Sequence, residues 1–185
     1  MCRISSISFN PAMLVAVRAG RKTVTRRRIS IDSLLQREPD QYRFVGLSAQ
    51  GALFENIYSQ PPVLLPALPL PFGPAGHLLR VAEDPHLQLQ VRRVWAEQVR
   101  CLTAADALAE GIYQRISANQ LQWGGVEPAL EPGAYRWCRS PIEAFWGLLD
   151  TIYPTAWARN EWVWVIEFAR LPDTVAAPSS VDATI

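Results

Sequence analysis

Apolar and polar positions near the start of the chain predict a strand, a short helix and a second strand. Residues 4–9 alternate between apolar and polar side chains, as a half-buried strand does. Asn10 suits the N-cap of a helix, Pro11 its first position and Gly20 the position after its end. We therefore predict a helix over residues 11–19, followed by a turn that leads into a second strand.

The middle of the chain predicts mainly strands. Residues 42–58 have the pattern of a hairpin with its turn near Gly51. Residues 60–76 contain six prolines, and we expect them to run extended over the surface, because proline cannot continue a helix or donate to a strand ladder. Residues 78–83 and 87–101 alternate as strands do, and the second of them is long and rich in valine.

Two further helices and a last strand follow. Thr103 and Asp106 form a capping-box pattern, and we expect that helix to end near Gly111. Ser140, followed by proline and glutamate, begins another helix. Residues 123–133 predict a loop or hairpin. The apolar face of the last helix would carry Ala144, Phe145, Leu148, Leu149 and Ile152, and residues 162–168 predict the closing strand.

Together these elements predict an α+β fold, a small mixed β-barrel with helices packed at its ends. We expect one domain over residues 1–171. The proline-rich residues 60–76 would be an insert within it, because the segments on either side are too short to fold alone. Residues 172–185 are predicted to be a disordered tail.

Composition narrows the functional classes. The 185 residues are 49% hydrophobic with a formal net charge of +1, which excludes a broadly basic surface that binds any polyanion. No stretch reaches the roughly 18 apolar residues that span a bilayer, and no signal-peptide pattern opens the chain. We expect a cytoplasmic protein with no membrane partner. The cysteines and histidines lack metal-site spacing, so we predict no metal and no cofactor: Cys2, Cys101, Cys138, His77 and His86.

Residues 20–27 form the basic sequence GRKTVTRR, which contains Lys22, the only lysine among 18 basic residues. Burial can lower the pKa of a lysine until it accepts a proton, which arginine cannot do. Thr25 follows three residues later, and a hydroxyl beside an amine base is suited to acyl transfer. Arg26 and Arg27 could donate hydrogen bonds to a phosphate or a carbonyl oxygen. The alternative is a solvated basic strand end.

At these residues the chain resembles the ASCH superfamily, small β-barrel proteins related in fold to the PUA RNA-binding domain, and within it the bacterial and phage-type branch. The resemblance covers most of the chain in order: residues 6–10, 13–17, 20–27, 76–83, 107–112 and 157–168. The turn at 20–27 and the closing strand are its most specific parts. The chain departs from the family pattern at three positions, where His77, Ala82 and Glu161 replace the usual aspartate, arginine and proline.

The resemblance implies a PUA-like barrel and a hydrolase that removes an acyl group from the exocyclic amine of N4-acetylcytidine or a similar modified nucleobase or nucleoside. In this role a neutral Lys22 would take the proton of Thr25, Thr25 would attack the amide carbonyl, and Glu110 would protonate the leaving amine. The side chains expected to bind the substrate are Arg21, Arg26, Arg27 and Glu83.

Two other functions stay open at this point. The resemblance also allows an RNA-binding or ribonuclease protein, or a sensor that binds a modified nucleotide without catalysis, so the expected partner is a modified nucleoside or RNA. Trp162 and Trp164 share one face of the closing strand and could stack bases. We favour a place for both in the core, because apolar residues flank them.

Overall fold

The structure is a computed structural model that describes residues 5–124 and 137–172. The strands are β1 (Ser5–Ile7), β2 (Val24–Arg28), β3 (Tyr42–Ser48), β4 (Gly51–Asn56), β5 (Val63–Leu64), β6 (Leu78–Val81), β7 (Asp84–Gln98), β8 (Tyr113–Ser117), β9 (Gln120–Gly124) and β10 (Trp162–Arg170). The helices are α1 (Pro11–Arg18), α2 (Leu34–Arg37), α3 (Ala104–Ala109) and α4 (Pro141–Ile152), with 3-10 turns η1 (Pro39–Gln41) and η2 (Val99–Cys101).

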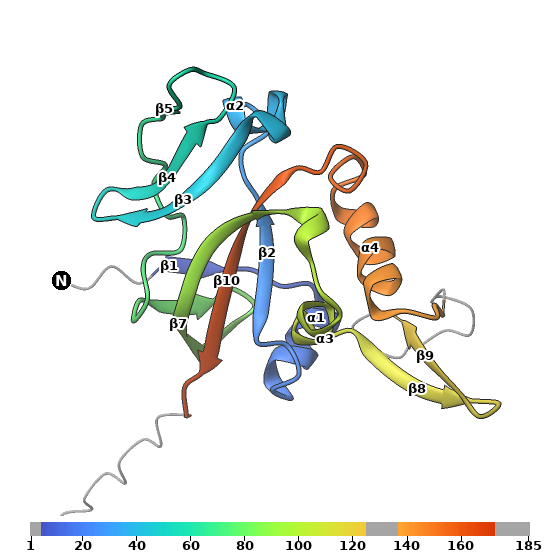
Figure 1. Cartoon of the computed structure of the whole chain (residues 1–185). Helices are drawn as coiled ribbons and strands as arrows, with labels where there is room; N and C mark the ends of the chain where they lie inside the picture. The colour runs from blue at the N-terminus through green and yellow to red at the C-terminus, as the bar shows by residue number, and fades with distance from the viewer. Residues whose placement is uncertain (1–4, 125–136, 173–185) are drawn as a thin grey trace, which may run out of the picture.

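The main sheet has the strand order β1-β6-β7-β10-β2 and curls into a half-barrel (Figure 1). Its β1–β6 pair is parallel and its other pairs are antiparallel. The long strand β7 pairs with β6 on one side and with β10 on the other. The predicted α+β class is confirmed. Within the described residues no ladder joins the edge strands β1 and β2, so the sheet does not close into a hydrogen-bonded barrel.

Strand β10 lies between β7 and β2, and both of its faces are covered. Trp162 and Trp164 belong to the cluster on the α1 side, whereas Val163 and Val165 belong to the cluster beneath α3 and α4. The two tryptophans are only 5% and 6% exposed, so they fill the core. The Trp162 and Phe54 rings pack edge to face with their centres 5.1 Å apart, and this contact packs the main sheet against the β3-β4-β5 sheet.

The helix boundaries follow the predicted capping residues. Asn10 Oδ1 accepts the Met13 N–H at 2.8 Å, and the Ser140 hydroxyl caps α4 in the same way. Both halves of the Thr103–Asp106 capping box are present in α3. Local side-chain chemistry thus determines where these helices begin.

The proline-rich residues 60–76 were expected to run extended over the surface without pairing as a strand, but part of this segment does pair. Val63–Leu64 pairs with β4, and Ala52 and Leu68 exchange backbone hydrogen bonds of 2.8 and 2.9 Å. Prolines lack a donor, but the residues between them keep theirs and can pair. Apolar side chains of the segment also pack against the core: Leu65, Leu68, Leu70 and Phe72.

The β8–β9 hairpin was not predicted, because the loop or hairpin expected from the sequence begins only at residue 123, whereas the hairpin spans residues 113–124. Ala118 and Asn119 form its turn with φ of 50° and 59°, and alanine is an uncommon residue in that conformation. Residues 125–133 of the predicted loop or hairpin, and the predicted tail from residue 173, lie outside the described residues. None of the helices in the described ranges is long and apolar enough to cross a membrane.

Candidate functional site

The basic turn is anchored at both ends by backbone hydrogen bonds. The N–H groups of Arg21 and Lys22 both donate to the carbonyl of Ala16, at 2.9 and 3.1 Å. The N–H of Thr23 donates to the carbonyl of Ala109 at 2.9 Å. The turn is therefore held between the end of α1 and the end of α3, so that Lys22 and Glu110 come together.

Lys22 and Glu110 form a buried ion pair. Lys22 Nζ lies 2.5 Å from Glu110 Oε2 and also donates to the Glu110 carbonyl oxygen at 3.1 Å. The two side chains are 0% and 4% exposed. Burial lowers the pKa of Lys22 below its ordinary value. The negative charge of Glu110 offsets part of this effect, while the nearby charges of Arg27 and Arg26 lower the pKa further.

Arg26 is the second cation that contacts Glu110. Its Nη1 donates to Glu110 Oε1 at 3.2 Å, while its Nε and Nη2 donate to Glu97 Oε1 at 3.0 and 2.7 Å. Nη2 also lies 3.4 Å from Asp106 Oδ1. Burial lowers the pKa of Arg26, but the carboxylates of Glu110, Glu97 and Asp106 outweigh burial and leave that pKa raised. All three guanidinium nitrogens thus have carboxylate partners.

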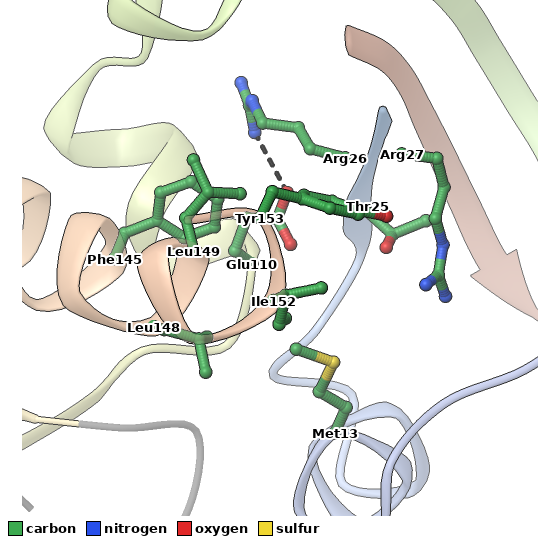
Figure 2. A pocket seen from close by; sticks show the side chains of 10 residues that line it. All are labelled: Met13, Thr25, Arg26, Arg27, Glu110, Phe145, Leu148, Leu149, Ile152 and Tyr153. Atoms are coloured by element: carbon green, nitrogen blue, oxygen red, sulfur yellow. Dashed lines mark hydrogen bonds and ion pairs between the residues drawn. The ribbon is translucent and has the colours of Figure 1, made fainter. Parts of the chain in front are cut away.

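Thr25 is 2% exposed and shares a small pocket with Glu110, Arg26 and Arg27 (Figure 2). The pocket has about 20 Å³ available to water-sized molecules, which is room for roughly one water. Lys22 does not line the pocket, although it contacts Glu110, which does. No hydrogen bond joins Lys22 Nζ to Thr25 Oγ1, so within the described chain Glu110 is the group that contacts both the amine and the pocket.

The opposite wall of the pocket is apolar. The predicted apolar face of α4 supplies most of it, and Met13 of α1 and Tyr153 after α4 complete it (Figure 2). Phe145 and Leu149 are each 3% exposed, so the wall is part of the core beneath α4. The side chains of this wall are Met13, Phe145, Leu148, Leu149, Ile152 and Tyr153.

Arg27 and Glu83 both contact the two residues Ser8 and Phe9 that follow β1. Arg27 donates through Nη2 to the carbonyl of Ser8, and its guanidinium lies 5.5 Å from the centre of the Phe9 ring. Its Nε is buried without an acceptor among the described residues. Glu83 accepts the Ser8 hydroxyl and the Phe9 N–H. The hydroxyl bond is the main reason that the Glu83 pKa is lowered. Arg27 lines the pocket, whereas the exposed Glu83 does not.

Arg21 lies on the other side of the turn. Its Nη1 donates to the carbonyl of Gly111 at 3.3 Å, and its guanidinium lies 5.9 Å from the centre of the Tyr113 ring. It is not among the residues that line the pocket. Of the four predicted substrate-binding residues, Arg26 and Arg27 therefore reach the pocket, and Arg21 and Glu83 do not.

Two residues of this cluster were missed by sequence reasoning. Glu97 binds Arg26, and Trp95 Nε1 donates to the other Glu97 oxygen at 2.8 Å. A glutamate in a long valine-rich strand is the one available signal, because a half-buried carboxylate there needs a cationic partner. Asp106 was predicted only as a helix cap, which it is. Its second oxygen faces Arg26.

Two of the three residues that differ from the ASCH sequence pattern, His77 and Glu161, have side-chain partners. His77 Nε2 lies 3.1 Å from Ser5 Oγ, and Ala82 is exposed. Glu161 is fully buried and pairs with Arg28 at 2.6 Å and with Arg159 at 3.3 Å. The glutamate at position 161 thus belongs to an ion-pair network at the start of β10 and does not line the pocket.

No group of three or more His, Cys, Asp or Glu side chains that could hold a metal is found within residues 5–124 and 137–172. No family model matches the chain, and neither a curated protein nor a solved structure matches it significantly.

Proposed function

We propose that the protein is a hydrolase of the ASCH type, built on an open PUA-like barrel, that cleaves an acyl amide on N4 of a modified cytidine such as N4-acetylcytidine. The observation that supports this most is the buried Lys22–Glu110 contact of 2.5 Å, directly behind a pocket that Thr25 also lines. A buried pair of this kind next to a hydroxyl can supply a base, an acid and a nucleophile.

The acylation step uses the pair in its neutral form, with the amine of Lys22 deprotonated and the carboxyl of Glu110 protonated. Burial of Lys22 favours this form of the amine. Lys22 exchanges its hydrogen bond to the Glu110 carbonyl for one to Thr25 Oγ1 and accepts the hydroxyl proton. Thr25 Oγ1 then bonds to the acyl carbon, the bond from that carbon to N4 breaks, and Glu110 gives its proton to N4. Cytidine leaves, and the acyl group remains on Thr25 as an ester.

The deacylation step reverses the proton flow. A water attacks the ester carbon and gives a proton to the Glu110 carboxylate, while the Lys22 ammonium returns a proton to Thr25 Oγ1. The products are the free carboxylic acid, the threonine hydroxyl and the original neutral pair. We assign Arg27 as the donor to the oxyanion, because this residue lines the pocket and its buried Nε has no acceptor among the described residues.

Release of acetate and cytidine from N4-acetylcytidine tests this proposal. We expect Lys22→Met and Thr25→Val to lower kcat/KM by at least about 100-fold, in line with the usual contribution of acid–base catalysis. Thr23→Val is the matched control, because Thr23 is an exposed hydroxyl in the same turn. Circular dichroism of each variant checks the fold.

The same assay separates the alternatives. A wild-type protein that binds N4-acetylcytidine without releasing acetate would be a sensor. One that binds oligonucleotides in a salt-dependent way and ignores the nucleoside would be an RNA-binding protein. Full activity in Thr25→Val would also overturn the proposal.

A further inference from the structure

We propose that Arg26, clamped by Glu97, is a positioning residue that holds the Glu110 carboxylate in place and divides its charge with Lys22. The catalytic consequence of this inference rests on the proposed function, whereas the arrangement itself can be tested without any activity. Arg26 lies outside the set of groups that the proposed reaction uses.

The geometry of the clamp joins three elements. Arg26 extends from β2 and binds Glu97 on β7 through two nitrogens, which leaves Nη1 for Glu110 at the end of α3. The planar fork of a guanidinium can bind two carboxylates in fixed directions, which a lysine ammonium cannot do. The Arg26 side chain is 1% exposed, so water cannot replace these contacts.

Glu97 is itself held in place. Its Oε2 accepts the Trp95 indole N–H at 2.8 Å, and its Oε1 accepts both Arg26 donors. The Arg26 guanidinium also lies 5.9 Å from the centre of the Phe145 ring in the wall of the pocket. The position of Glu110 is thus held by Arg26, and Arg26 is held in turn by Glu97 on β7, the central strand of the sheet.

The two cations compete for one carboxylate. Glu110 gives Oε1 to Arg26 and Oε2 to Lys22, and the other charges that act on Lys22 are those of Arg26 and Arg27 on β2. Without Arg26, Lys22 would face the whole charge of Glu110 and lose a cationic neighbour. Both changes would make the ammonium form of Lys22 more favourable.

Lys22 is the only lysine, so lysine labelled with 15N at Nζ gives a single side-chain NMR signal that reports its titration. We expect the pH midpoint of the Lys22 titration to rise in the double variant Arg26→Gln/Glu97→Gln. Both members of the Arg26–Glu97 pair are neutral in this variant, so position 97 carries no carboxylate without its cation. We expect it to fall in Glu97→Gln alone, because Arg26 then keeps its charge and loses a counter-charge. The single variant also covers the case in which the double variant fails to fold.

The matched control is Arg28→Gln/Glu161→Gln, which removes the ion pair between Arg28 of the same strand and the buried Glu161; neither residue lines the pocket or is among the charges that shift the pKa of Lys22. It should leave the Lys22 midpoint unchanged. Identical titrations in wild type, Glu97→Gln and the Arg26 double variant would overturn the inference. So would an equal shift in the control, since that would report a general loosening of the fold.

Activity gives the second readout. The acidic limb of the pH profile of kcat/KM should move in the same direction as the NMR midpoint, and kcat/KM at neutral pH should fall at least about tenfold in the Arg26 double variant. A profile that does not move while the NMR midpoint does would overturn the catalytic part. If the wild type releases no acyl group at all, the proposed function fails, and the NMR titration still decides the role of Arg26.

Discussion

Lys22 Nζ and Glu110 Oε2 lie 2.5 Å apart, although 88 positions separate the two residues in the chain. Neither side chain has an appreciable exposed fraction, and each is placed by backbone contacts between the basic turn and the end of α3. A buried ion pair contributes little to stability on balance, because desolvation of the two charges offsets their attraction. Its presence next to a pocket is therefore better explained by function.

Lys22 should resist amine-reactive reagents in the folded protein, because its side chain is fully buried. We expect an N-hydroxysuccinimide ester to leave Lys22 unmodified under native conditions and to modify it in denaturant, as measured by peptide mass spectrometry. Thr23→Lys provides the control, since it places an exposed lysine in the same turn and should react at once. Equal rates at positions 22 and 23 would contradict the burial of Lys22.

The lowered pKa of Lys22 predicts a specific dependence of stability on pH. Between its pKa in the folded protein and the ordinary lysine value of about 10.4, the unfolded chain binds the Lys22 proton and the folded chain does not. Stability therefore rises with pH through this window, and the penalty is greatest below the folded pKa. The free energy of unfolding of wild type relative to Lys22→Met should increase toward alkaline pH in denaturant titrations. A difference that is constant with pH would show that the Lys22 pKa is not lowered.

The Arg28–Glu161 pair should contribute to stability, although neither residue lines the pocket. We expect Arg28→Met to lower the free energy of unfolding by about 3 kcal/mol, because it leaves a buried carboxylate with fewer partners. Glu161→Gln in the same chain should recover part of that loss, since the amide carries no charge. Chemical denaturation of the two single variants and the double variant forms the thermodynamic cycle. Additive losses would contradict direct coupling.

The narrow pocket predicts a preference for small acyl groups. Ile152 lines the pocket and is 43% exposed, so Ile152→Ala should open it at a cost of at most about 1 kcal/mol in stability. We expect the variant to raise kcat/KM for N4-butyrylcytidine relative to N4-acetylcytidine. Val15→Ala is the control, because Val15 is equally exposed but does not line the pocket. An unchanged ratio would mean that the acyl group binds elsewhere.

The sequence by itself determined the features that depend on neighbouring residues. Asn10, Thr103 and Ser140 cap the helices as predicted, because a capping side chain bonds to a backbone N–H only two or three residues away. The continuous apolar run of β10 likewise determined a strand that is buried on both faces, with Trp162 and Trp164 inside. Lys22 and Thr25 became candidates through their own chemistry and Glu110 through the family resemblance, and the catalytic role of all three stays a prediction.

Only the tertiary structure decided which charges meet. Arg26, Arg27 and Arg28 are consecutive and chemically identical, yet they contact Glu97 and Glu110, the Ser8 carbonyl, and Glu161, respectively. Alternation along β2 sends neighbours to opposite faces, but the identity of each partner depends on how β7, α3 and β10 pack around the strand. The same packing places α4 over Thr25 and leaves a pocket of about one water. Because these contacts join residues that are distant in the chain, no local pattern carries them.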